Sequence, residues 1–489
     1  MSARHVALEL APRHFEGLDV DGETPLRLVR SALGDAGKEV STQAAYLDLA
    51  VNEDLVNIVE AFLAAKAKHS NATEQRPTTG LTNRTAVAQA TASLVSTSAT
   101  TANTLALLLS PHGHGLLVAG ADKSLSFNAI NNKTYAASTN YSSVNAGSPC
   151  LALAVSDQTI AAAKMDGSVA LFNAHSLQQQ SLFKEHSKYA SKIAFSPSKQ
   201  WLVSAGYDWK LVCYKFNEEL QMYSPAHSLA FLGAIESLVF LPGCDTVCVG
   251  SRNDPNLHFI TLDQSTTDEP VRQRRSMNKN GDDWVSFTPM DMAIVANHSE
   301  EGSLDSITSW TLAVYSDLPS GKICLYNIAS PNDRLSDASP SSTAASAAEP
   351  NTIPLPTPVN STTPSTIVSP SFTLSWIGDC FGVVADAFSR PRCVFMSIGK
   401  RLVLAATSDD SKVILYDALS VLTNEEGVAK KVGEVVGHAG IIRALCVEEG
   451  TGVDEGGEGG GDEDSNMNSA YLWTGSFDST IRKWQITLK

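Results

Sequence analysis

The chain has 489 residues, a net charge of −16 and 43% hydrophobic residues, which is enough to bury a large core. Its N-terminus has no apolar stretch typical of a secretory signal, and no window approaches the ~20 apolar residues of a membrane span. Eight cysteines occur without a C-x-x-C pair, a pattern that favours reduced, buried thiols. We therefore expect a protein of the cytoplasm, the nucleus or both, with no membrane span.

Residues 1–90 are expected to form an extension built from one strand and two helices. RHVALEL at 4–10 has the character of a strand, and Pro25 to Leu33 that of a short helix with proline in its first turn. Residues 41–69 predict an amphipathic helix, because apolar residues recur at three- and four-residue spacing: Ala44, Leu47, Val51, Leu55, Ile58, Val59 and Phe62. We expect the helices to pack on the following domain; the alternative is a dimerisation or docking element.

Residues 91–489 repeat one pattern of strand, turn and strand. Each unit has short runs rich in β-forming residues, punctuated by Gly, Pro, Asp or Ser, and helical periodicity is absent. The units can be placed at 104–130, 150–173, 186–216, 235–262, 290–328, 390–418 and 437–489. The pattern therefore predicts an all-β protein with seven units, although the length would also accommodate eight.

Two segments interrupt the repeat. Residues 331–370 are rich in Ser, Thr, Pro and Ala without apolar periodicity, which predicts a disordered insert between units. Residues 448–464 carry eight carboxylates and no Lys or Arg, half of the net charge of the chain. We expect this acidic loop to be a solvated excursion that repels nucleic acid; attraction of a basic partner is the alternative. The arginines of VRQRRSMNKN at 271–280 are expected on a solvated loop.

The last unit, LWTGSFDSTIRKWQ at 472–485 preceded by Gly437-His438, resembles one complete repeat of the WD-repeat β-propeller family. The resemblance implies a seven-bladed β-propeller with a short α-helical N-terminal extension. It also implies a structural hydrogen-bond chain through His438, Thr474, Asp478 and Trp484. In the third unit the matching residues are His186, Ser204 and Asp208, with Tyr214 in place of the tryptophan.

Closure of the ring requires a fourth strand for the last unit. The chain ends shortly after the third strand of that unit, so we expect the missing strand to come from residues 85–103 or from 4–10. Closing the ring in this way removes exposed sheet edges.

A candidate binding face is indicated by the residue that precedes the turn aspartate. Met165, Tyr207 and Phe477 occupy this place in three units, and Trp209 follows Asp208. Methionine and aromatic side chains are favoured at protein interfaces. We expect these four side chains to form one arc that binds protein; in the alternative each packs against its neighbouring blade.

The function expected from these features is that of a non-enzymatic scaffold or subunit of a multiprotein complex. One alternative is a regulatory or substrate-recruiting subunit of an enzyme complex, for example in ubiquitination or RNA processing. Another is a propeller hydrolase, although no G-x-S-x-G elbow, P-loop or G-x-G-x-x-G motif is present. We expect no catalytic residues, no metal and no cofactor, protein partners of unknown identity, and no direct binding of nucleic acid.

Overall fold

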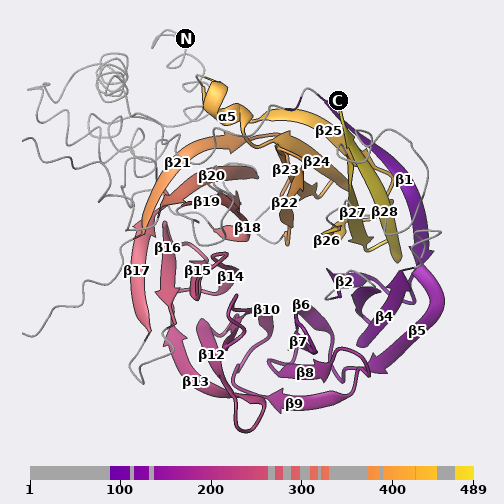
Figure 1. Cartoon of the computed structure of the whole chain (residues 1–489), viewed down its shortest axis with the longest axis vertical. Coiled ribbons are helices and arrows are strands. Elements are labelled where there is room, and N and C mark those ends of the chain that lie inside the picture. Colours follow the sequence, from indigo (N-terminus) through magenta and orange to yellow (C-terminus); the bar gives the residue numbers. More distant parts are fainter. Residues whose placement is uncertain are drawn as a thin grey trace, which may run out of the picture. The chain divides into compact units, whose positions relative to one another are not determined.

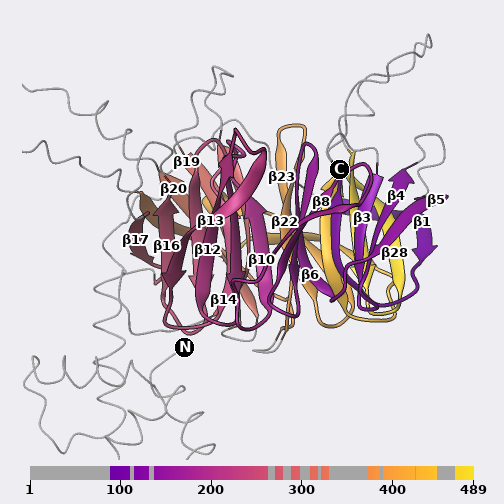
Figure 2. The same ribbon diagram turned by 90° about the horizontal axis from the view of Figure 1, so that it is seen from below.

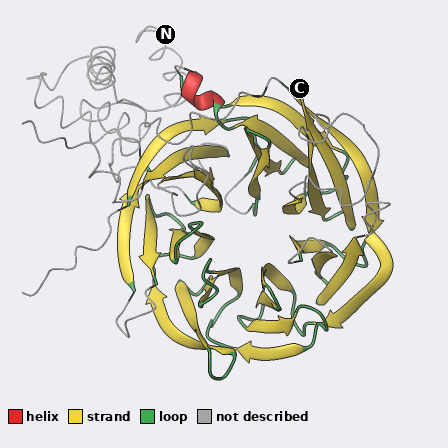
Figure 3. Cartoon of the chain, viewed as in Figure 1, coloured by secondary structure: helices red, strands yellow, loops and turns green. Residues whose placement is uncertain are grey.

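The computed structural model describes residues 87, 89–110, 115–130, 137–262, 270–278, 288–297, 309–317, 321–329, 372–385, 389–424, 426–448 and 469–489. Within these ranges the regular structure is β-strand apart from one short helix (Figure 3). The expected N-terminal helices, the segment 4–10, the insert 331–370 and acidic residues 449–464 lie outside the described residues.

The strands form seven antiparallel sheets of four strands, the blades, in each of which hydrogen-bonded neighbours follow one another in the chain except where β1 joins blade seven. Blade one consists of β2 (Thr104–Leu109), β3 (Gly115–Gly120), β4 (Ser124–Ile130) and β5 (Ala137–Asn145), and blade two of β6 (Cys150–Ser156), β7 (Thr159–Lys164), β8 (Val169–Asn173) and β9 (Gln179–Phe183). Blade three consists of β10 (Ala190–Phe195), β11 (Trp201–Gly206), β12 (Lys210–Asn217) and β13 (Met222–Ala230). Blade four consists of β14 (Ile235–Phe240), β15 (Thr246–Ser251), β16 (Asn256–Thr261) and β17 (Val271–Ser276). Blade five consists of β18 (Pro289–Asn297), β19 (Ser309–Ser316), β20 (Lys322–Ala329) and β21 (Thr373–Cys380). Blade six consists of β22 (Cys393–Ile398), β23 (Arg401–Ser408), β24 (Lys412–Asp417) and β25 (Lys430–Val436), with helix α5 (Ser420–Thr423) between β24 and β25. Blade seven consists of β26 (Ile442–Glu448), β27 (Ser469–Ser476), β28 (Thr480–Leu488) and β1 (Ala90–Ala99).

The blades follow one another around a central axis (Figure 1). The first strand of each blade contacts the first strand of the next, and β26 contacts β2, so the ring is closed. Figure 2 shows the same blades edge-on. The described residues therefore form the seven-bladed β-propeller that the repeat pattern predicts.

The core lies between the blades. Every residue of β11 and of β15 is buried, because each second strand is covered on both faces by the neighbouring blades. One core cluster, for example, combines Ala161 and Val169 of blade two with Leu202 and Tyr214 of blade three. Burial of apolar side chains thus holds each blade to the next.

Blade seven is completed by the N-terminal strand β1, which pairs antiparallel with β28 from Ala90 opposite Leu488 to Ala99 opposite Thr480. The prediction that residues 85–103 close the ring is confirmed. Two further bonds hold this strand: the Lys489 amide donates to the Gln89 carbonyl at 2.9 Å, and the Val87 amide donates to Asp417 Oδ2 at 2.9 Å. The second bond reaches blade six, so closure involves two blades.

Six of the seven first strands contain an irregularity immediately after their first residue. A bulge of this kind turns one side chain out of the regular alternation and increases the local twist. In blades four and seven the residues at this position are Glu236 and Arg443. These two side chains contribute to the interaction face described below.

All eight cysteines are free thiols, and seven of them are buried, as their spacing predicts. Burial raises the pKa of Cys150 and of Cys213 to about 12, so these thiols are protonated and inert at neutral pH. Across the described part of the chain, no helix is long and apolar enough to cross a bilayer.

Candidate interaction face

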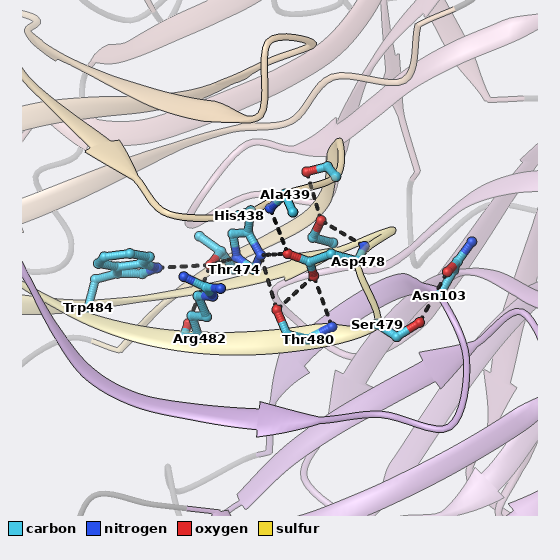
Figure 4. Close-up of polar contacts among 11 residues, drawn as sticks. Asn103, His438, Ala439, Thr474, Asp478, Ser479, Thr480, Arg482 and Trp484 are labelled. Carbon is cyan, nitrogen blue, oxygen red and sulfur yellow. Dashed lines mark hydrogen bonds and ion pairs between the residues drawn. The ribbon is translucent and has the colours of Figure 1, made fainter.

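The hydrogen-bond chain of blade seven links β27, β28, the turn between them and the segment that enters the blade (Figure 4). Trp484 Nε1 donates to Thr474 Oγ1 at 2.9 Å, and His438 Nε2 lies 2.7 Å from the same hydroxyl. His438 Nδ1 lies 2.9 Å from Asp478 Oδ2, which also accepts the Ala439 amide at 3.0 Å. The segment is close to the indole, since a Cβ on Gly437 would lie 2.9 Å from the Trp484 ring.

The donors and acceptors of this chain match in one arrangement. Because an ionised carboxylate only accepts, His438 Nδ1–H donates to Asp478, and Nε2 of the neutral ring accepts from the Thr474 hydroxyl, which itself accepts from the Trp484 indole. Burial lowers the pKa of His438, partly offset by Asp478. Burial raises the pKa of Asp478, but hydrogen bonds from Thr480, His438 and Ala439 outweigh it and hold the value at about 2. The histidine is therefore neutral and the aspartate ionised at neutral pH.

Blade three has the same chain with a tyrosine at its end. His186 Nδ1 lies 2.9 Å from Asp208 Oδ1, and His186 Nε2 lies 2.7 Å from Ser204 Oγ. The Tyr214 hydroxyl lies 3.3 Å from Ser204 Oγ. The structure thus brings together every residue named for the two hydrogen-bond chains. The side chains of these residues are buried or nearly buried, so they can stabilise the blades but are not exposed to contact a ligand.

Blade four contains a histidine–aspartate pair that the repeat pattern does not reveal. His258 lies on β16 itself, and its Nε2 is 2.7 Å from Asp254 Oδ2. Arg272 on β17 donates from Nε to His258 Nδ1 at 3.0 Å, so this histidine carries its proton on Nε2, the opposite tautomer to His438. Burial lowers the pKa of His258. The four-residue spacing of Asp254 and His258 can be seen in the sequence. It did not predict this pair, because in blades three and seven the matching histidine lies before the first strand of the blade.

The placement of 271–280 on a solvated loop was wrong. Residues 271–276 form the outermost strand of blade four, and two of the arginines are engaged: Arg272 with His258, and Arg275, whose Nε donates to the Phe372 carbonyl at 2.5 Å. Arg272 binds an acceptor on its own sheet and Arg275 binds one in the segment before β21 of blade five, so these guanidinium groups have partners without a nucleic acid. The prediction failed because the run of arginines lacks the alternation of apolar and polar residues that marks a strand, and the groups that bind these arginines lie elsewhere in the sequence.

The turns between the second and third strands lie at one end of the blades and define what we call the turn face. In all seven blades one turn residue donates its backbone N–H to a carbonyl of the segment leading into a first strand, over 2.8 to 3.3 Å. These equivalent positions are held by Ala121, Met165, Tyr207, Arg252, Asp317, Asp409 and Phe477. Three of the four candidate binding residues therefore occupy matching places on one face, and Trp209 lies in one of the same turns.

Exposed apolar side chains gather on the turn face. Met165 is 58% exposed, Trp209 50% and Phe477 40%, and neighbouring segments of the same face add Leu232, Phe381 and Val384. These six make up half of the twelve large hydrophobic side chains that are exposed in the described part of the chain. An apolar concentration of this kind is typical of an interaction surface.

Tyr207 and Phe477 are less free than the other two candidates. The Tyr207 ring stacks on Tyr189 with centroids 4.1 Å apart, and its hydroxyl donates to Glu236 of blade four at 2.5 Å. Phe477 packs under the Arg443 guanidinium, which also reaches Asp409 of blade six at 3.6 Å. In both places the residue at the strand irregularity joins two neighbouring blades. Met165 and Trp209 are the side chains available to a partner.

Trp209 has a backbone conformation that bulky residues rarely adopt. Its φ is +67°, and the matching residue in every other blade also has a positive φ. Those positions are occupied by Lys123, Gly167, Asn253, Gly321, Ser411 and Ser479. Trp209 is the single aromatic residue of the set, so its exposed indole is held in place at some cost in backbone strain.

The comparison with protein families agrees with this architecture. Residues 177–215 match the family model described as WD domain, G-beta repeat. The matched segment contains β9, the outermost strand of blade two, and β10, β11 and most of β12 of blade three, so the sequence repeat is offset from the blade by one strand. A search of curated proteins found no match. Together, the matched repeat and the seven four-stranded blades show that this chain is a WD-repeat β-propeller.

Proposed function

We propose that the protein is a non-enzymatic scaffold or complex subunit that binds protein partners through its turn face. WD-repeat propellers act generally as protein-interaction scaffolds. The observation that carries the proposal for this chain is the gathering of six exposed apolar side chains on one face. Aromatic and methionine side chains bury much area at low cost in entropy, which makes them effective anchors. The eight free thiols suit a reducing compartment, so the proposal includes the cytoplasm, the nucleus or both.

Rigidity of the face supports this role. Seven equivalent backbone bonds hold the turns to the segments beside them. Glu236 and Arg443 then tie the turns of adjacent blades together. Since a preformed surface loses little conformational entropy on association, a face built in this way binds without first having to order itself.

The hydrolase alternative is not supported by the geometry of its best candidate. His438, Thr474 and Asp478 have the residue types of a catalytic triad, but the His438 side chain is fully buried and Thr474 has no exposed surface. The Thr474 hydroxyl also donates to His438 while accepting from the buried Trp484 indole. A nucleophile needs access to a substrate, and this hydroxyl has none. A structural role accounts for all of its contacts.

The test is co-purification of the tagged full-length protein with quantitative mass spectrometry. We compare wild type with Trp209→Ala and Met165→Ala, and use Leu220→Ala as a matched control because Leu220 is 66% exposed in the turn between β12 and β13. Loss of an aromatic anchor typically costs 2 kcal/mol or more of binding, roughly thirtyfold in affinity. We expect the same partners to be lost with Trp209→Ala and kept with the control, at unchanged melting temperature. Equal recovery by all variants would contradict the proposal.

A further inference from the structure

A cluster of tyrosines and arginines lies on the turn face where blades three, four and six approach one another. It consists of Tyr189, Tyr207, Glu236, Arg252 and Arg390, and we call it the tyrosine–arginine cluster. The guanidinium carbon of Arg390 lies 5.5 Å from the Tyr189 ring centre and 5.3 Å from that of Tyr207. Arg390 precedes β22 of blade six, so it reaches the stacked tyrosines from a blade that is not adjacent to theirs.

An ion-pair network beside the cluster brings these blades together. Lys192 of β10 donates from Nζ to Asp291 Oδ1 at 2.5 Å, and the other oxygen of Asp291 accepts the Cys393 amide at 3.0 Å. Arg392 Nη1 also lies 3.4 Å from Asp291 Oδ1. One carboxylate on β18 therefore joins blades three, five and six, and holds the segment of Arg390 against blade three.

The carboxylates around Arg390 are already engaged by other cations. Glu236 Oε1 accepts from both Nε and Nη2 of Arg252, at 3.0 and 2.6 Å. Asp291 is shared by Lys192 and Arg392, and Asp409 lies 3.6 Å from Arg443. Among the described residues, no carboxylate lies within ion-pair distance of Arg390. Among the described side chains named here, five are cations and three are carboxylates, in a chain whose net charge is −16.

An apolar site lies next to this positive centre. Trp209 belongs to the same turn as Tyr207, and its carbonyl accepts the Phe231 amide at 2.8 Å. Leu232, the next residue, is 86% exposed. This backbone bond places the segment of Leu232 beside the turn that contains Tyr207 and Trp209. A ligand that contacts both must combine negative charge with apolar bulk.

We propose that the tyrosine–arginine cluster recognises an acidic peptide of a partner protein, with a carboxylate side chain bound to Arg390 and a neighbouring large apolar side chain against Trp209 and Leu232. This inference rests on the proposed function and names the chemistry of its partner. The Arg390 guanidinium lies over the two tyrosine rings. A planar guanidinium can form paired hydrogen bonds to one carboxylate. The peptide supplies the negative charge that the cluster lacks.

We take a partner, rather than the acidic stretch 449–464, as the occupant. The segment that contains 449–464 is attached at Glu448, the last residue of β26, whereas Ile441 at the start of that strand is the residue bonded to the turn face. The attachment point therefore lies at the end of the blade opposite to the cluster. A separate peptide is not restricted in this way, and its negative charge is attracted by the local surplus of cations.

The experiment selects peptides and then tests one of them. A random peptide library displayed on phage is panned against the immobilised full-length protein, and the most enriched peptide is synthesised with its Asp and Glu intact or replaced by Asn and Gln. Binding is measured by fluorescence polarisation to wild type, Arg390→Glu, Arg390→Lys and Trp209→Ala. Lys123→Glu is the matched control, because Lys123 occupies an equivalent turn on the same face and the substitution changes the charge equally.

We expect enriched peptides that combine Asp or Glu with a large apolar residue. Arg390→Glu should weaken binding roughly ten- to a hundredfold, the value of a hydrogen-bonded charge, while Arg390→Lys weakens it less and Lys123→Glu has little effect. Replacement of the acidic residues in the peptide should have the same effect as Arg390→Glu. Selection of peptides without acidic residues, or equal binding by wild type and Arg390→Glu, would overturn the inference.

The outcome separates this inference from the proposed function. If partners or peptides depend on Trp209 but are insensitive to Arg390→Glu, the face binds protein and the acidic specificity is wrong. If no partner and no peptide depends on Trp209, the proposed function fails as well. Melting curves of each variant identify any loss of binding that arises from unfolding. Arg390→Lys keeps the charge, so it separates the effect of charge from that of the planar guanidinium.

Discussion

Blades seven and four both contain a buried histidine bonded to an aspartate, yet the two pairs connect different parts of the fold. In blade seven, His438 comes from the segment before β26 and is forty residues from Asp478, so the bond ties the entry of the blade to the turn between β27 and β28. In blade four, His258 and Asp254 are four residues apart, and Arg272 extends the network outward to β17. A histidine–aspartate hydrogen bond thus holds the segment before the first strand in blade seven, whereas in blade four it supports the outermost strand, β17.

This difference also changes the turn face. In blade four the turn carries Arg252 at the position equivalent to Tyr207 and Phe477, where it pairs with Glu236. Blade seven instead places an exposed phenylalanine there. Blade four therefore presents a charged residue at this position, and blade seven an aromatic one. The predictions that follow test this division.

The largest effect is expected from Asp478→Ala in blade seven. The substitution leaves His438 Nδ1–H and two backbone amides without their acceptor, which costs on the order of 2–3 kcal/mol. Because this blade closes the ring, the melting temperature of the whole propeller should fall, and amide exchange should rise first near Ala439. An exposed control, Asp157→Ala, removes a surface ion pair and should change stability by less than about 0.5 kcal/mol. Equal melting of Asp478→Ala and wild type would show that the bond has no structural value.

Asp254→Ala in blade four should destabilise less, by roughly 1–2 kcal/mol, because blade four is not the blade that closes the ring. The informative measurement is the location of the change by hydrogen exchange. Protection should decrease in β17 and not in residues 231–234, which the Arg252 amide still holds. Loss of protection at 231–234 with β17 unaffected would reverse the assignment of the two networks.

A smaller effect is expected at the outer end of the blade seven chain. Trp484→Phe removes the indole donor to Thr474 Oγ1 and should cost about 1 kcal/mol by thermal denaturation. The matched change in blade three, Tyr214→Phe, should cost less, since its hydroxyl lies 3.3 Å from Ser204 Oγ rather than 2.9 Å. A larger loss of stability from Tyr214→Phe than from Trp484→Phe would show that the hydrogen-bond chains of blades three and seven are not equivalent.

The smallest effect is a pH dependence that both blades share. His438 and His258 have pKa values lowered from the ordinary 6.5, chiefly by burial, so below that pH the unfolded chain binds protons that the folded chain does not. Stability should therefore decrease as pH falls below 6.5. It should decrease again below about pH 4 as Asp478 and Asp254, held near 2, lose their advantage over the unfolded carboxyls. Melting temperature measured against pH for wild type and His438→Gln should show a shallower decline near pH 6 in the variant.

The sequence was sufficient for the architecture because its information is local and repeated. Short runs of β-forming residues, the turns between them and, in most units, an aspartate in the turn recur along the chain, which specifies a blade and, by repetition, the ring. The chain of His438, Thr474, Asp478 and Trp484 could be named in advance for the same reason. A propeller without a fourth strand in its last blade would expose a sheet edge, so the sequence predicted a closing strand from 85–103 or 4–10, and the structure has it at β1.

Contacts between blades depend on which turns meet in space, and only the tertiary structure decided them. Tyr207 and Phe477 read alike in the sequence as exposed anchors, but Glu236 and Arg443 from adjacent blades partly cover them, while Trp209 remains open. Arg390 reaches Tyr189 and Tyr207 only because the ring brings residues almost two hundred positions apart onto one face. Local spacing in the sequence determines the blade. Which side chains form a surface is decided by closure of the ring, because no periodic signal encodes a contact between residues of different blades.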